Sequence, residues 1–214
     1  EAIEVRERAY AAATRTGDPI AAATAAISLG RDNLLRNDLA VATAWLNRAE
    51  RVLEGVPENA GHGFLAACRA FGMTLSGDAE GALREASAAL EIAERLGDRD
   101  LAAFAGREKG FALAVTGKVD EGLALIDDSI VAAIGGELGP STAGGVCCTS
   151  IETCAALGEC RLGLRLGDHA GGPARDGARR GRVRGPADPG RCFQSLANGL
   201  AVACGPAAGR LAPG

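Results

Sequence analysis

The sequence is poor in aromatic side chains and in histidine. Aromatic residues make up 3% of the 214 residues, with one Trp, one Tyr and five Phe, and there are two histidines. With 47% hydrophobic residues in all, the chain has enough apolar side chains to fold around a core. That core must consist of alanine and aliphatic side chains packed at close range, which suits helices against helices.

Long apolar runs and a strong charge of either sign are also lacking. No run approaches the roughly 18 residues of a membrane-spanning helix, and the charged start of the chain does not resemble a secretion signal. The formal net charge of −4 provides no basic field for nucleic-acid phosphates. We therefore expect a cytoplasmic protein without membrane contact and without nucleic-acid contact through this chain. Because the first residue is Glu and not Met, we also expect a longer polypeptide.

Residue patterns typical of catalysis are missing. His62 and His169 lie far apart in the sequence, and nothing places a nucleophile beside either of them. His62 is expected at a helix start, pointing to solvent. The Gly-x-x-x-x-Gly-Lys-Ser/Thr phosphate loop does not occur. We expect no enzyme activity, no catalytic residues and no cofactor.

The seven cysteines predict reduced thiols. Their number is odd and most of them lie late in the chain, which does not suit a disulfide framework at this length. Cys147 and Cys154 are seven residues apart and share a helix face, but a zinc site needs paired ligands from two separate elements. We expect structural thiols and no metal site.

A repeat organises the first 160 residues. Turn signals recur about every 20 residues, and between them apolar side chains follow helical spacing. The signals are Gly17-Asp18, Asn37-Asp38, Pro57-Glu58, Gly77-Asp78, Gly97-Asp98 and Gly117-Lys118. Two helices therefore form one unit of 40 residues. The pattern predicts helices at residues 2–16, 20–36, 40–54, 60–76, 79–96, 100–116, 119–134 and 142–157.

Three columns of small residues appear when the chain is aligned with itself at a shift of 40. They read Gly30, Ala70, Gly110; Ala42, Ala82, Gly122; and Ala49, Ala89, Ser129. This spacing resembles the tetratricopeptide repeat, although that family's Trp and Pro positions are not matched and its period is about 34. The resemblance implies an all-α, right-handed superhelical solenoid of antiparallel helix pairs over residues 1–160. An Ala-rich helical bundle with coincident spacings is the alternative.

A second resemblance covers roughly residues 60–160. The stretch from Gly117 to Asp128, then Gly136 to Pro140 and a Cys-containing segment, is similar to the helical repeat region of LuxR-type bacterial regulators. The resemblance implies the sensor or interaction region of such a regulator. No helix-turn-helix pattern occurs here, so DNA binding does not carry over. The alternative is a free-standing adaptor or scaffold without a DNA-binding domain.

Phenylalanines mark the candidate site. Four of the five are seven residues apart within a helix and 40 apart between helices, so they share one stripe. In the family resembled, first helices line a concave groove, and two arginines fall on the same or neighbouring rows. The predicted groove binds an extended peptide or a small effector; the alternative is that the rings are ordinary core. The residues are Phe64, Phe71, Phe104, Arg107, Phe111 and Arg31.

After about residue 160 the helical pattern stops. Residues 161–190 are rich in Gly, Arg, Pro and Ala, and Gly-Pro pairs would break any helix there. We expect residues 161–214 to form an irregular or disordered tail. Two explanations stay open: a natural basic linker, or a reading frame lost near residue 160.

Overall fold

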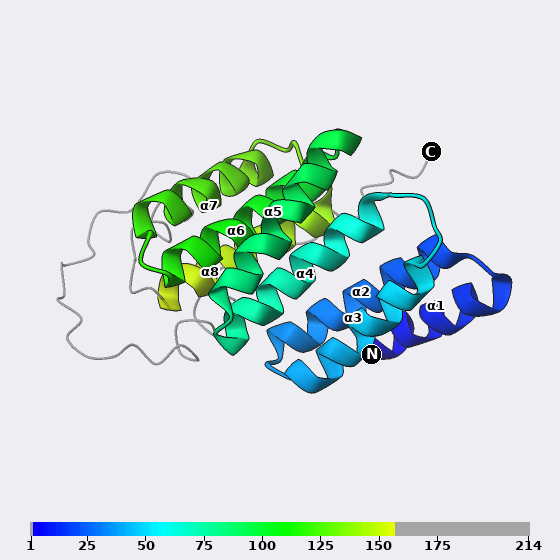
Figure 1. The fold of residues 1–214 in the computed structure, drawn as a ribbon. Coiled ribbons are helices and arrows are strands. Elements are labelled where there is room, and N and C mark those ends of the chain that lie inside the picture. Colours follow the sequence, from blue (N-terminus) through cyan, green and yellow to red (C-terminus); the bar gives the residue numbers. More distant parts are fainter. Residues whose placement is uncertain (1, 157–214) are drawn as a thin grey trace, which may run out of the picture. The chain divides into compact units, whose positions relative to one another are not determined.

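The computed structural model describes residues 2–156, and every regular element among them is an α-helix (Figure 1). The elements are α1 (Ala2–Thr16), α2 (Pro19–Leu35), α3 (Leu39–Leu53), α4 (Ala60–Ser76), α5 (Ala79–Leu96), α6 (Arg99–Val115), α7 (Val119–Ile134) and α8 (Pro140–Ala156). The all-α prediction is confirmed, and the helix ends agree with the predicted ones to within about two residues, which is the usual spread between ways of assigning a boundary. Within residues 2–156, no helix combines the length and the apolar composition needed to cross a bilayer.

The chain divides into two compact units, residues 1–147 and 148–214. The division falls inside α8. Of the second unit, the structure describes the last turns of this helix, where the Thr153 hydroxyl donates to the carbonyl oxygen of Thr149 at 2.9 Å. The tail predicted at residues 161–214 lies outside the described residues.

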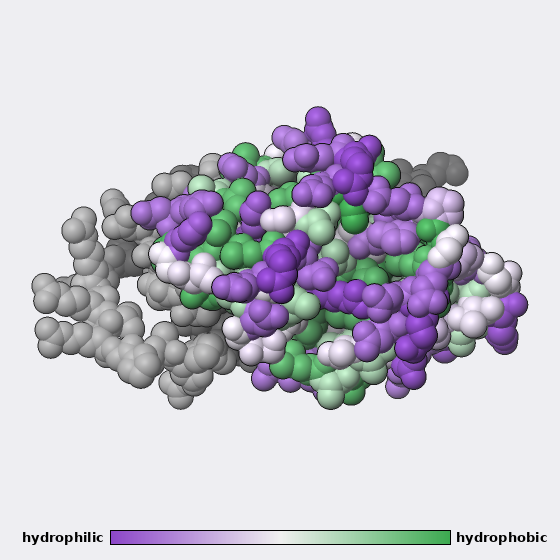
Figure 2. Space-filling view, viewed as in Figure 1, coloured by the Kyte–Doolittle hydropathy of each residue, from purple (hydrophilic) through white to green (hydrophobic). Residues whose placement is uncertain are grey.

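Helices of the first unit pack against their neighbours in the sequence. Three hairpins form, from α2 and α3, from α4 and α5, and from α6 and α7. The second members α3 and α5 also pack on the helix that comes after them, and α2, α4 and α6 lie side by side (Figure 1). We call α2, α4 and α6 the first helices, and α1, α3, α5 and α7 the second helices. The face in Figure 2 is largely hydrophilic, with apolar side chains between the polar ones.

Short turns account for the 20-residue period. Gly77 and Gly97 end their helices with φ angles of 89° and 64°, a left-handed conformation that glycine adopts without a steric penalty. An aspartate follows four of the turns, and its side chain accepts a hydrogen bond from the backbone N–H three residues later, at 2.9–3.3 Å. The four aspartates are Asp18, Asp38, Asp78 and Asp98.

Three turns depart from this pattern, those before α4, α7 and α8. Before α4, Asn59 is the capping residue, and its side chain accepts from the N–H of Gly61 at 2.9 Å. His62 Nδ1 accepts in return from the Asn59 backbone N–H at 3.3 Å, so His62 is half-buried in a cap and does not simply point to solvent as expected. Lys118 stands where the period would place an aspartate, and α7 begins without a side-chain cap.

The small-residue columns lie where first and second helices touch. Ala42, Ala82 and Ala89 are 0% exposed. A Cβ atom added to Gly110 would lie 2.5 Å from the carbonyl oxygen of Gly122. Because that neighbour is backbone, no side-chain rotation could relieve the overlap. The small residues therefore set how closely the helices of a hairpin approach, as the sequence columns predict.

Overpacking this contact should destabilise the fold. Ala89→Leu adds three heavy atoms at a position that is 0% exposed, and we expect the free energy of unfolding to fall by about 1–3 kcal/mol. Glu94→Ala, on the exposed side of the same helix, should change it by less than about 0.5 kcal/mol. Urea denaturation measures both. An equal fall in the free energy of unfolding of the two variants would show that Ala89 does not lie at the helix contact.

Candidate functional site

The phenylalanines come together in pairs across α4 and α6. The ring centroids of Phe64 and Phe104 are 5.8 Å apart, and those of Phe71 and Phe111 are 6.3 Å apart. Phe104, Phe71 and Phe111 are only 3%, 5% and 8% exposed, while Phe64 is half-buried. The four rings therefore form one stripe, as the spacing predicts, but three of them belong to the core between the first helices.

A cavity of about 340 Å³ opens at one end of this stripe. Phe64 and Phe104 contribute one wall, and Arg31 of α2 contributes a guanidinium group. We call it the Arg31 cavity. Its lining comes from α2, from α4 and the residue before it, from α6 and from the start of α8: Ile20, Thr24, Ile27, Ser28, Arg31, Asn59, Ala60, Gly61, Phe64, Cys68, Phe104, Ser141 and Thr142. Three of the six predicted site residues thus meet in one place.

Arg31 is the charged group of this cavity. Its side chain is half-buried, and its Nε has no hydrogen-bond partner. The guanidinium also lies against α8, because a Cβ atom added to Gly145 would be 3.4 Å from Nη1. An arginine N–H that is buried without an acceptor is costly.

Arg107 lies in the interior and does not line the cavity, although the sequence placed it on the groove. It is 0% exposed, and its guanidinium carbon lies 5.2 Å from the ring centroid of Phe71 and 5.8 Å from that of Phe111. Its Nη2 donates to Oε2 of Glu108 at 3.1 Å, and Glu108 is 1% exposed. The two rings cover Arg107 because they fill the space between α4 and α6, so Phe71, Arg107 and Phe111 form a buried cluster.

This cluster is incompletely satisfied. Nε and Nη1 of Arg107 and Oε1 of Glu108 have no hydrogen-bond partner. Burial raises the pKa of the Glu108 carboxyl from 4.5 to about 7, and the positive charges of Arg107 and Arg31 act in the opposite direction. A buried ion pair of this kind is weak evidence for stability, because removing both charges from water costs several kcal/mol.

Cys68 stands at the wall of the Arg31 cavity. It is 1% exposed, and burial together with the nearby Glu108 charge raises the pKa of its thiol to about 12. The thiolate is the reactive form of cysteine, so this thiol is unreactive at neutral pH. Over residues 2–156, no group of three or more His, Cys, Asp or Glu side chains is arranged to hold a metal ion. The cysteines beyond Ala156 lie outside the described residues.

Glu108, Cys68 and the start of α8 were not predicted as part of the site. For Glu108, the alignment of the chain with itself contains a signal. At a shift of 40, Arg107 and Glu108 fall on Ala67 and Cys68, which are 0% and 1% exposed. Two charges at positions that are buried Ala and Cys in the preceding repeat indicate a buried ion pair. No comparable signal places Ser141 and Thr142 beside Arg31, because that contact joins segments about 110 residues apart.

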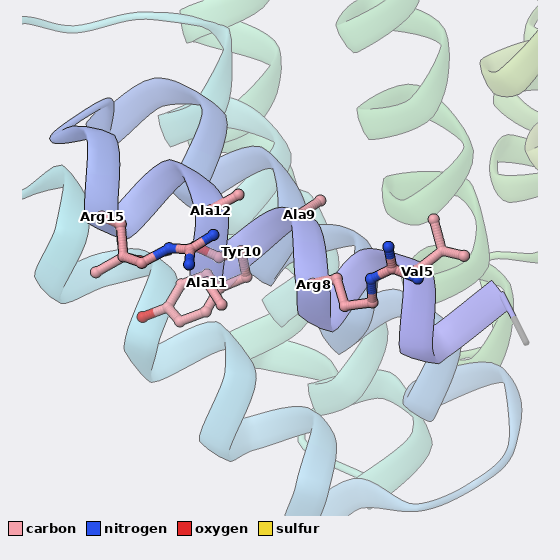
Figure 3. A pocket seen from close by; sticks show the side chains of 8 residues that line it. Val5, Arg8, Ala9, Tyr10, Ala11, Ala12 and Arg15 are labelled. Atoms are coloured by element: carbon pink, nitrogen blue, oxygen red, sulfur yellow. The ribbon is translucent and has the colours of Figure 1, made fainter.

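A second hollow runs along the surface of α1 (Figure 3). All its lining residues, from Val5 to Arg15, belong to this one helix. It is therefore an open helix face and not an enclosed site.

The chain matches no protein-family model, no curated protein and no solved structure.

Truncating Phe111 should cost far more stability than truncating Phe64. Phe111→Ala removes a ring that is 8% exposed, and we expect a loss of about 3–5 kcal/mol in the free energy of unfolding. Phe64→Ala, at the cavity wall, should cost less because its ring is already partly in contact with solvent. Chemical denaturation of both variants measures this. A small loss for Phe111→Ala would mean that its ring is not core.

Burial of Glu108 should make stability depend on pH. Between pH 4.5 and about 7 the folded protein holds this proton while the unfolded chain has released it. The contribution of Glu108 to stability is therefore present below pH 4.5 and is lost as the pH rises to 7. Glu108→Gln should show a flatter decline over that window than the parent, whereas the exposed-site control Glu94→Gln should follow the parent. Denaturation at successive pH values measures the free energy of unfolding of all three proteins. The same pH dependence in all three would contradict a buried Glu108 carboxyl with a raised pKa.

Proposed function

We propose that the chain is a binding module whose Arg31 cavity takes a small effector with a carboxylate group, as the sensor region of a LuxR-type bacterial transcriptional regulator. The observation that carries the proposal is the cavity itself: an arginine side chain and two phenyl rings line a space of about 340 Å³. Ligand sites of proteins start at about 300 Å³ and combine apolar walls with a few polar groups.

The chemistry of the lining defines the ligand class. A carboxylate complements a guanidinium in charge and in hydrogen-bond geometry. Ile27, Phe64 and Phe104 supply an apolar wall for the body of the ligand. A small aromatic or branched aliphatic acid fits both parts.

A free small molecule suits this cavity better than an extended peptide. A peptide needs a groove that continues along the first helices. Phe71, Arg107 and Phe111, which would continue it, are at most 8% exposed. The lining is instead concentrated at one end of the stripe, where four helices contribute to it.

The proposal includes a tetratricopeptide-like, right-handed superhelical solenoid for the repeat region. Consecutive hairpins, side-by-side first helices and buried small-residue columns support it. In such arrays each unit packs on its neighbours, and ligands bind on the surface that the stacked units share. Binding without turnover is proposed, in keeping with the unreactive Cys68 thiol at the cavity wall.

The regulator assignment rests on the sequence resemblance over residues 60–160. It places the DNA-binding domain outside this chain and the module in the cytoplasm. The net charge of −4 supports a module that does not itself contact nucleic acid.

An adaptor role is the second candidate, and one observation favours it. Leu35, Leu75 and Val115 stand 40 residues apart at the ends of the three first helices, and they are 43%, 39% and 46% exposed. A row of exposed apolar side chains suits a protein partner. A helix-turn-helix encoded in the same gene would favour the regulator, and its absence there would favour the adaptor.

Binding of simple aromatic acids tests the cavity. Phenylacetate and 3-phenylpropionate should bind in calorimetric titrations, and phenylacetamide should bind more weakly because it lacks the charge. Arg31→Gln should weaken acid binding by roughly tenfold or more, since hydrogen bonds to charged groups contribute about 1.5–3 kcal/mol.

The matched control is Arg36→Gln. Arg36 comes directly after the same helix but is exposed and does not line the cavity, so this variant should keep the parent affinity. Circular dichroism melts establish that both variants fold. Equal acid affinity in Arg31→Gln and the parent, or no binding of either acid to the folded parent, would contradict the proposed ligand class.

A further inference from the structure

Glu108 lies one helical turn from the wall of the Arg31 cavity. Phe104 lines the cavity, and Glu108 follows it four residues later, so the two side chains share a face of α6. On α4 the same spacing joins Phe64 and Cys68, which both line the cavity. Because Cys68 and Glu108 are 40 residues apart, the carboxyl stands on α6 where the thiol stands on α4. Glu108 is therefore a buried neighbour of the cavity, although it does not line it.

Two positive charges and one negative charge are grouped at this place. Nη2 of Arg107 donates to Oε2 of Glu108 at 3.1 Å, and Oε1 of Glu108 has no hydrogen-bond partner. Arg31 acts on the same carboxyl through its charge, which favours the ionised form of Glu108. Arg31 thus belongs both to the cavity lining and to the electrostatic surroundings of Glu108. The carboxylate of a ligand and the carboxylate of Glu108 would share this cation.

A second carboxylate in these surroundings favours protonation of the first. Two like charges repel each other strongly where water is excluded, so the pKa of one carboxyl rises when another carboxylate binds nearby. Glu108 is 1% exposed, and burial already raises its pKa to about 7. A ligand that pairs with Arg31 also offsets part of the positive charge that keeps Glu108 ionised. Both effects act in the same direction.

We propose that the Arg31 cavity binds its acid together with one proton, which the Glu108 carboxylate takes up. The inference rests on the proposed function, because it concerns the same cavity and the same ligand class. The ligand carboxylate pairs with Arg31, and a proton from solvent bonds to a carboxylate oxygen of Glu108 to form the neutral acid. One anion enters as another is neutralised, so the net charge of the site is unchanged. The module therefore responds to pH as well as to its effector, and it binds more tightly as the pH falls.

Other groups around Glu108 do not change charge near neutral pH. Burial raises the pKa of the Cys68 thiol on α4 to about 12, and the guanidinium groups of Arg31 and Arg107 stay charged. The acidic and basic side chains of α5 and α7, which pack on α6, are exposed or half-buried. In α8, the thiols of the described part are also exposed or half-buried. His62 needs a control, because it shares a helix cap with a residue of the cavity lining.

Calorimetric titration with phenylacetate in buffers of low and high ionisation enthalpy measures the proton. Near neutral pH the parent should take up a fraction of a proton for each acid bound. Its affinity should fall at least about fivefold from about pH 6 to about pH 8, which is within the ordinary range of coupling between two sites. The ligand itself stays ionised throughout, since carboxyl groups of this kind titrate at about pH 4. Phenylacetamide, which brings no charge, should bind without proton uptake and with the same affinity at both pH values.

Glu108→Gln isolates the contribution of the buried carboxyl. Glutamine has the shape of the protonated acid and keeps an oxygen that accepts from Arg107. This variant should bind phenylacetate at about pH 8 as tightly as the parent does at about pH 6, and without proton uptake. His62→Gln is the matched control, because glutamine keeps an acceptor for the Asn59 N–H. It should retain the pH dependence and the proton uptake of the parent. Circular dichroism melts establish that both variants fold, and proton uptake by the parent is measured without either.

Three results would overturn the proposal: acid binding to the parent without proton uptake, an unchanged pH dependence in Glu108→Gln, or the loss of that dependence in His62→Gln. In each of these cases the acid still binds, so the proposed function stands and only its coupling to Glu108 is wrong. If neither phenylacetate nor 3-phenylpropionate binds to the folded parent at any of these pH values, the proposed function is wrong and the coupling with it.

Discussion

Close contact between first and second helices at the small-residue columns is the constraint on which the rest of this structure depends. Gly110 and Gly122 approach until the backbone of one helix meets that of the other, and Ala42, Ala82 and Ala89 are completely buried. Hairpins packed this closely need few bulky side chains, which explains how a chain with 3% aromatic residues forms a core. The contact also concentrates the remaining large side chains between successive first helices, where the phenylalanine stripe lies.

The buried Arg107 and Glu108 are the exception to this apolar core. Two charged side chains occupy columns that hold Ala67 and Cys68 in the preceding repeat, and rings rather than water surround the guanidinium. Such a pair stabilises little by itself. Its effect extends to the cavity, because the Glu108 charge raises the pKa of the Cys68 thiol and the Arg31 charge lowers that of Glu108. The candidate site and the buried pair therefore share one electrostatic environment.

The packing of the repeat changes at both ends of the first unit. Where a second helix has a first helix before it, residues such as Ala49 are covered; where it has none in the described chain, Ala9 is exposed. At the other end of the first unit, the start of α8 lies beside Arg31 and helps to enclose a cavity. In such arrays the stacked units share an extended concave surface for binding, and here the first helices of three units line the cavity together with the start of α8.

The helices, the turns and the helix contact all follow from the amino-acid sequence. These features depend on local rules: left-handed glycines, aspartate caps and small residues at a fixed spacing, each readable from a few neighbouring positions. It also placed four phenylalanines on one stripe. Tertiary structure alone decided that Phe71, Arg107 and Phe111 are covered while Phe64 and Arg31 line a cavity, because burial depends on which distant helix fills the space above each side chain. Helical spacing fixes the direction of a residue around its own helix, but not what that residue faces.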